Sequence, residues 1–246
     1  MYSPEFFMET TKTMEYTLSI DIKLAINALC KSVDTEPSFK IMVQEKISMQ
    51  DLTRELNKLT QDNKSVQIPI ILKIVAINNI EDFMTTFFNV ICINSFFSDV
   101  YVLLYKELNL ISDLNTYLDK QYTMMIESLN TFIIESPDNY DAYCIYKTEN
   151  NRRRAFTKFI VNLVNASVIS VQYYTDLVQY IISKIQLLTT IDDKERMNEY
   201  VELLAILNPK DDVNQTQIRQ WSILNPTTSL GINNKILFRF MDIMCE

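Results

Sequence analysis

The sequence predicts an all-α protein built from paired helices. The 246-residue chain contains one glycine, Gly231, and six prolines, whereas sheet-rich folds need glycine at tight turns and bulges. Apolar residues recur with helical spacing along most of the chain. Because 48% of the residues are apolar and 22% are charged, the composition suffices for a core in one or two domains.

The helical periodicity is clearest after residue 80, where apolar residues occupy the i, i+3, i+4, i+7, i+8 and i+11 positions of one helix face. The residues on this face are Ile80, Phe83, Met84, Phe87, Phe88 and Ile91. Similar stripes begin at Leu52, Phe156, Val171, Met197 and Ile236. We expect the aromatic members of these stripes, and Trp221, to lie in the core.

Short polar breaks separate the stripes, and several offer Ser, Asn or Asp as a helix N-cap. Pro137, Pro209 and Pro226 lie where helices should end. The segments therefore pair into five antiparallel hairpins, which are 49–60 with 65–78, 80–94 with 97–110, 113–135 with 150–168, 171–189 with 193–208, and 213–223 with 231–245.

A repeat of roughly 40 to 47 residues is typical of HEAT-type helical repeats. Such hairpins each bury a face against their neighbours and leave an extended surface for partners. We expect a HEAT-type helical-repeat stack over residues 48–246, preceded by an N-terminal leader at residues 1–47.

The residues needed for common catalytic chemistry are missing. The chain has no histidine, which excludes Ser-His-Asp and Cys-His machinery. One glycine cannot form a phosphate-cradling Gly-rich loop. The pairs Asp192–Asp193 and Asp211–Asp212 lie at helix starts, where capping explains them better than catalysis. The sequence therefore predicts no enzyme and no cofactor.

Metal, nucleic-acid and membrane binding are also disfavoured. The four cysteines (Cys30, Cys92, Cys144 and Cys245) are far apart, and we expect buried, reduced thiols in a cytosolic protein rather than a metal site. A net charge of −8 argues against bulk nucleic-acid binding. The most apolar run, residues 68–77, is too short to span a bilayer, and no N-terminal signal is visible. We expect a cytoplasmic protein without membrane contact.

Four stretches resemble, in order, the middle domain of eukaryotic translation initiation factor 4-gamma. Residues 52–60 contain E-L-N-K-L-T, similar to the family's L-N-K-L-T, and residues 93–101 are similar to its E-P-N-F-S-x-x-Y junction. Residues 151–163 resemble the A-R-R-R helix that ends in F-I-G-E-L, with Val161 in place of the glycine. Residues 236–244 are similar to the closing R-I-R-F-M-L-x-D-V-L helix. The family's charged insert before the arginines is shortened here, to roughly residues 137–150.

The resemblance implies a scaffold that binds a DEAD-box RNA helicase similar to initiation factor 4A and holds its two lobes in a productive orientation. The candidate contacts to helicase or RNA are Asn57, Lys58, Arg152, Arg153, Arg154 and Lys158. The alternative for the arginine cluster is a solvated helix start, and the alternative for Asn57 and Lys58 is an ordinary exposed helix face. Abundant Ile, Asn, Lys and Tyr suggest an AT-rich coding genome, such as that of a large cytoplasmic DNA virus or of an AT-rich parasite.

The N-terminal segment resembles the family's motif for a cap-binding protein similar to initiation factor 4E, Y-x-x-x-x-L-Φ. Tyr2 and Met8 fit the motif, and Phe7 occupies the leucine position. Ser3 and Pro4 are suited to the cap and first position of a short helix, from which Phe7 and Met8 would dock on a partner groove. The alternative is that this aromatic tail packs back on the fold.

Other functions remain open from the sequence. Related helical domains serve mRNA decay and nuclear cap-binding assemblies. A structural or virion protein with a helical core is a further alternative, and an enzyme would need chemistry without histidine.

Overall fold

The structure is a computed structural model that describes residues 49–77 and 79–245. The chain divides into two units, Met1–Ile47 and Ser48–Glu246. The predicted docking residues Tyr2, Phe7 and Met8, together with Cys30, lie outside the described residues.

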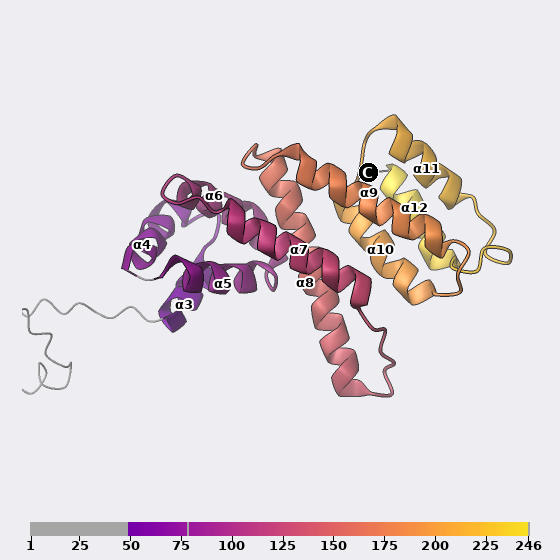
Figure 1. Cartoon of the computed structure of the whole chain (residues 1–246), viewed down its shortest axis with the longest axis horizontal. Coiled ribbons are helices and arrows are strands. Elements are labelled where there is room, and N and C mark those ends of the chain that lie inside the picture. The colour runs from indigo at the N-terminus through magenta and orange to yellow at the C-terminus, as the bar shows by residue number, and fades with distance from the viewer. Residues whose placement is uncertain (1–48, 78, 246) are drawn as a thin grey trace, which may run out of the picture. The chain divides into compact units, whose positions relative to one another are not determined.

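Every regular element of the described residues is helical, which confirms the all-α prediction (Figure 1). The α-helices and one short 3-10 helix, η1, are α3 (Met49–Lys58), α4 (Lys64–Ile77), α5 (Ile80–Ile91), η1 (Ser95–Phe97), α6 (Ser98–Asn109), α7 (Asn115–Thr131), α8 (Tyr140–Asn165), α9 (Val171–Leu188), α10 (Lys194–Leu207), α11 (Asp212–Ser222) and α12 (Asn234–Cys245).

Side-chain caps fix several of these helix starts, as the polar breaks predict. Asp193 Oδ1 accepts a hydrogen bond of 3.0 Å from the Arg196 amide, and Asp211 Oδ1 accepts one of 2.9 Å from the Asn214 amide. Both aspartates therefore cap helices, α10 and α11, which confirms the role expected of the two acidic pairs. At its other end, α10 terminates on Asn208, whose left-handed backbone (φ 46°) precedes a proline.

One predicted helix boundary is wrong by ten residues. Helix α8 begins at Tyr140 rather than at residue 150, so most of the segment interpreted as a shortened insert is helical. Asn139 caps this earlier start by accepting from the Ala142 amide at 3.5 Å. Tyr146 is the only buried residue of the extension, and the next buried residues of α8, Asn150 and Arg153, are polar. A search for apolar stripes therefore misses the helical period here.

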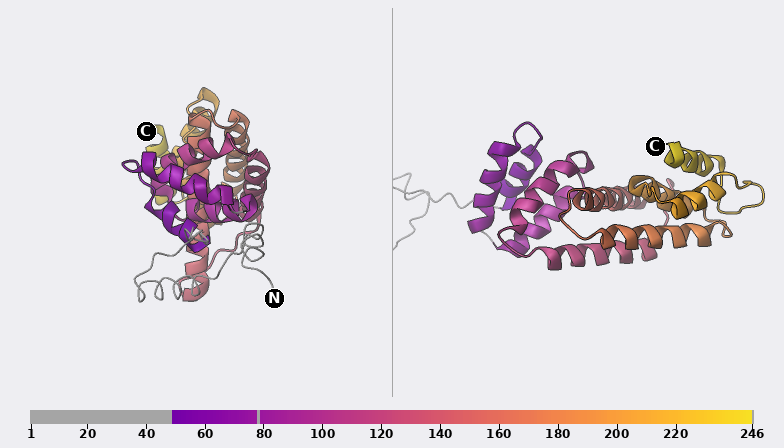
Figure 2. Two further views of the ribbon diagram at one scale, coloured as in Figure 1. Left: turned by 90° about the vertical axis from the view of Figure 1, so that its left-hand side faces the viewer. Right: turned by 90° about the horizontal axis from the view of Figure 1, so that it is seen from above.

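Most helix contacts join elements one or two positions apart in chain order (Figures 1 and 2). The even-numbered helices form a continuous row in which α4 packs on α6, α6 on α8, α8 on α10, and α10 on α12. Among the odd-numbered helices, α3 packs on α5. Tyr122 of α7 meets Tyr173 of α9 with ring centroids 5.4 Å apart, and Trp221 of α11 donates to Gln186 of α9 at 3.3 Å.

Aromatic clusters fill the space between the helices. Phe87 of α5 stacks on Tyr105 of α6, with centroids 6.3 Å apart, and meets Phe159 of α8 edge-on at 6.2 Å. Further along the chain, Trp221 packs against Phe240 of α12 with centroids 5.6 Å apart. These residues are buried, which confirms the expected core positions of the aromatic stripes and of Trp221.

The single glycine lies where two backbone segments meet. A Cβ atom on Gly231 would stand 1.9 Å from the carbonyl oxygen of Leu188 and 2.8 Å from that of Ile191. The segment between α11 and α12 therefore lies directly against the end of α9, and only a residue without a side chain fits there.

Within residues 49–77 and 79–245, no single helix is long and apolar enough to cross a bilayer. The pair formed by α5 and residues 95–109, bent by 105°, meets the length and composition requirements of a membrane span only when its two parts are taken together.

Candidate protein-binding surfaces

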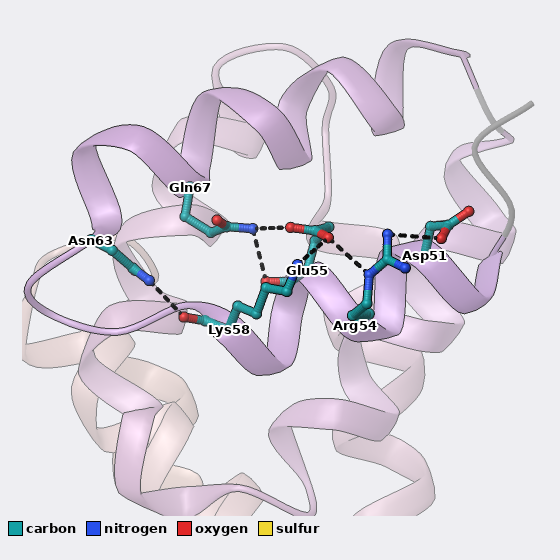
Figure 3. Close-up of polar contacts among 6 residues, drawn as sticks. All are labelled: Asp51, Arg54, Glu55, Lys58, Asn63 and Gln67. Atoms are coloured by element: carbon teal, nitrogen blue, oxygen red, sulfur yellow. Dashed lines mark hydrogen bonds and ion pairs between the residues drawn. The ribbon is translucent and has the colours of Figure 1, made fainter. Parts of the chain in front are cut away.

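The first candidate surface is the end of α3, where Asn57 and Lys58 are both exposed. The Lys58 ammonium donates to Glu55 Oε1 at 2.8 Å (Figure 3). Glu55 also accepts from Gln67 Nε2 at 2.6 Å and from Arg54 Nε at 3.1 Å. The cationic side chains at this end of α3 are thus held around one carboxylate, with their outer parts open to solvent.

The turn that follows α3 is fixed by a reciprocal side-chain bridge. Asn63 Nδ2 donates to the Lys58 carbonyl at 2.8 Å, and Asn63 Oδ1 accepts from the Thr60 amide at 2.8 Å. Gln67 also donates to the Glu55 carbonyl at 3.2 Å, which ties α4 to α3 (Figure 3). The surface that presents Asn57 and Lys58 is therefore preformed.

This network stabilises the ionised form of Glu55. Its side chain is 12% exposed and lies among donors. Hydrogen bonds from Lys58, Gln67 and Arg54 outweigh the effect of partial burial and lower the pKa of Glu55 to about 2.

The second candidate surface, the arginine cluster, lies in the middle of α8 and is largely committed to contacts within the protein. Arg152 donates to Asn89 Oδ1 of α5 at 3.0 Å. Arg154 pairs with Glu199 of α10 at 2.5 Å. Arg153 is 6% exposed and donates to Asn150, and burial lowers the pKa of Arg153.

Phe132, the residue after α7, contacts one arginine of this cluster, Arg153, and one of α10, Arg196. The guanidinium carbons of Arg153 and Arg196 each lie 4.9 Å from the centre of its ring. Tyr200 meets the ring edge-on at 6.0 Å and donates to the Leu129 carbonyl at 2.7 Å. This arrangement, which we call the Phe132 clamp, joins the end of α7 to α8 and α10.

The structure therefore corrects the interpretation of the arginine cluster. The prediction that it begins a helix is wrong, because α8 starts at Tyr140. Arg153 is buried, with 6% of its surface exposed, and Arg154 is held by Glu199. Lys158 is exposed, so the exposed cationic candidates come from two separate helices, Lys58 from α3 and Lys158 from α8.

Two functional features escaped the sequence interpretation. Glu199 is 4% exposed although it is charged. The apolar residues Met197 and Val201, two positions away on either side, lie on another face of the helix and could not signal its burial. The Phe132 clamp had no signal either, because its partners are distant along the chain.

The cysteines only partly match the expected buried thiols. Cys92 is buried, whereas Cys144 and Cys245 are exposed, and none of the three is in a disulfide. Within residues 49–77 and 79–245, no group of three or more His, Cys, Asp or Glu side chains could hold a metal ion.

Neither the family models nor the curated proteins compared with this sequence give a match.

Proposed function

We propose that residues 48–246 form a HEAT-type scaffold that binds a DEAD-box RNA helicase in translation initiation, and that residues 2–8 attach a cap-binding protein to it. The observation that carries the proposal is the continuous row of even-numbered helices from α4 to α12. Repeat scaffolds are built in this way, with each hairpin burying one face against its neighbours and leaving the rest for partners. The resemblance to the middle domain of initiation factor 4-gamma supplies the identity of the partners.

Such a scaffold acts without chemistry of its own. A helicase that alternates between lobe arrangements is shifted toward the arrangement that fits the scaffold best. This requires a stiff surface, and the bridge between Asn63 and α3 together with the Phe132 clamp supports that stiffness. ATP hydrolysis remains with the helicase.

The exposed residues Asn57, Lys58 and Lys158 are the helicase contacts that we propose. Arg152, with 31% of its side chain exposed, adds a partly available cation. Arg153 and Arg154 support the surface by holding α8 against its neighbours rather than by touching the partner.

The test is a measurement of RNA-stimulated ATP hydrolysis by a purified helicase of the initiation factor 4A type. Adding the full chain should raise the rate, and the variant carrying Asn57→Ala, Lys58→Ala and Lys158→Ala should raise it less. Lys235→Ala, an exposed lysine on α12, is the matched control and should behave as the unchanged protein. Absence of both binding and stimulation would overturn the helicase proposal.

The bridge to a cap-binding protein is tested separately. Changing Tyr2 and Phe7 to Ala should abolish co-purification with a cap-binding protein of the initiation factor 4E type, since loss of an aromatic anchor costs on the order of 2 kcal/mol. The circular dichroism spectrum and helicase binding should stay unchanged. If the unchanged protein binds the helicase but does not bind the cap-binding protein, it is instead a scaffold of mRNA decay or nuclear cap-binding assemblies. Self-assembly without helicase binding would indicate a structural or virion protein.

A further inference from the structure

A groove lies between the segment that follows α7 and the N-terminal half of α8. It has a volume of about 370 Å³, and its lining includes Phe132, Ile133, Glu135, Ile145, Tyr146 and Glu149. Figures 1 and 2 show this half of α8 and the 132–139 connection extending beyond the neighbouring helices. We call it the α7–α8 groove.

The inner wall of the α7–α8 groove is fixed by the protein itself. Phe132 is 8% exposed and is held by Arg153 and Arg196 in the Phe132 clamp. Tyr146 is 5% exposed. Because these rings are already packed, a ligand entering the groove would not have to order them, which favours binding.

The outer wall is apolar and open to water. Ile133 is 72% exposed and Ile145 is 66% exposed, and both line the groove. Nearby on α8, Tyr140 is 72% exposed. Exposed aliphatic side chains on two sides of a preformed hollow mark a place where a partner can bury apolar surface.

The surroundings of the groove are acidic. Residues 127–149 carry five carboxylates and one lysine, a net charge of −4. Three arginines follow at 152–154, of which Arg154 is paired with Glu199 and Arg153 is 6% exposed. The lysine, Lys147, lies over the rings of Tyr143 and Tyr146, at 5.2 and 5.3 Å from their centres. Glu135 and Glu149 line the groove itself, together with the buried Arg153. Glu149 also lies 3.7 Å from Arg152, with 51% of its side chain exposed.

This charge selects among occupants. Nucleic acid would bring phosphates against the carboxylates and is disfavoured. A second copy of this chain would bring the same acidic rim against itself and add like-charge repulsion. A cationic protein segment gains attraction from the same groups and approaches faster because of it.

We propose that the α7–α8 groove binds a basic amphipathic segment of a partner protein. Two or three aliphatic side chains of the segment enter between Ile133 and Ile145, and its Lys or Arg residues face Glu135 and Glu149. None of the residues proposed for helicase contact lines the groove, and the peptide test below does not involve the helicase.

The test uses two fluorescent model peptides with the same helical leucine pattern, one with lysine and one with glutamate at the remaining positions. Binding to the full chain is followed by fluorescence anisotropy at low and high salt. The lysine peptide should bind at least about tenfold more tightly than the glutamate peptide, and added salt should weaken the binding of the lysine peptide. Equal binding of the two peptides would overturn the proposal.

Single variants locate the site. The substitutions Ile133→Asn and Ile145→Asn keep the net charge. Each should lower the affinity of the protein for the lysine peptide by about fivefold or more. Ile223→Asn, an isoleucine outside the groove that is 78% exposed, is the matched control and should leave binding unchanged. Unchanged binding by both groove variants, or self-association of the chain that Ile145→Asn abolishes in sedimentation equilibrium, would contradict the assignment.

Discussion

Arg154 of α8 donates a hydrogen bond of 2.5 Å to the carboxylate of Glu199, which lies on α10. Glu199 is 4% exposed, whereas 30% of the Arg154 side chain is exposed. A cation from the neighbouring helix of the even-numbered row thus reaches the buried carboxylate. Burying a charge is costly unless it is paired in this way.

We predict that Arg154→Met lowers the free energy of unfolding by about 2–4 kcal/mol, because it leaves Glu199 buried without a cation. In the double variant Arg154→Met with Glu199→Met, the loss of free energy of unfolding should be clearly smaller than the sum of the losses in the two single variants. Urea denaturation of all three measures this coupling, and strictly additive losses would contradict it. Lys194→Met, which removes the exposed pair with Asp192, is the control and should cost less than about 1 kcal/mol.

The Phe132 clamp predicts a second destabilising change. Phe132→Leu keeps an apolar side chain but loses the contacts of the ring with Arg153 and Arg196, and we expect a loss of about 1–3 kcal/mol in the free energy of unfolding. Ile133→Leu alters the exposed neighbour and should have almost no effect. Equal stability of the two variants in urea denaturation would show that the ring is not held as described.

Gly231→Ala should disrupt the segment between α11 and α12. The new Cβ atom would lie 1.9 Å from the Leu188 carbonyl oxygen, so one of the two backbones must move, at a cost of about 1–3 kcal/mol or more. Hydrogen exchange should increase first around residues 188–191 and 224–233. Leu230→Ala, at a neighbouring side chain that is 54% exposed, is the control. If this variant speeds hydrogen exchange in the same two segments as Gly231→Ala does, the close backbone approach is not the cause.

Glu55 predicts an acid-sensitive contribution to stability. Its pKa falls from an ordinary 4.5 to about 2 in the folded protein, chiefly through the hydrogen bonds from Lys58 and Gln67. The contribution is therefore complete above about pH 4.5 and is lost as the pH falls toward 2. Lys58 and Arg54 are more than half exposed, and solvent screening limits the effect to on the order of 1–2 kcal/mol.

Glu55→Gln tests this by urea denaturation across the acid range. The variant should be less stable than the unchanged protein at neutral pH, and the difference should shrink as the pH approaches 2. Glu107→Gln, at an exposed carboxylate of α6, is the matched control. A constant difference at every pH would exclude the proposed role of the carboxylate.

The cysteines predict a pattern of chemical reactivity. Burial raises the pKa of Cys92 to about 11, and its thiolate is both scarce and shielded near neutral pH. Cys144 and Cys245 are exposed. In peptide mapping after brief alkylation, Cys92 should be modified at least about tenfold more slowly than the other two, and comparable labelling of all three in the folded protein would contradict its burial.

The sequence by itself determined the helical class and most helix limits, because these depend on interactions between residues close along the chain. Asp193 and Asp211 cap helices through amides three residues away. The spacing that brings Phe83 and Phe87 to one face likewise predicted their burial.

The tertiary structure alone decided what the arginines do. The sequence places three cations side by side, but only folding brings Phe132 and Arg196 around Arg153 and sets Glu199 beside Arg154. The same long-range packing forms the α7–α8 groove from residues on either side of a connection. Periodicity reports which face of a helix is buried, whereas the partner on that face depends on how distant helices meet.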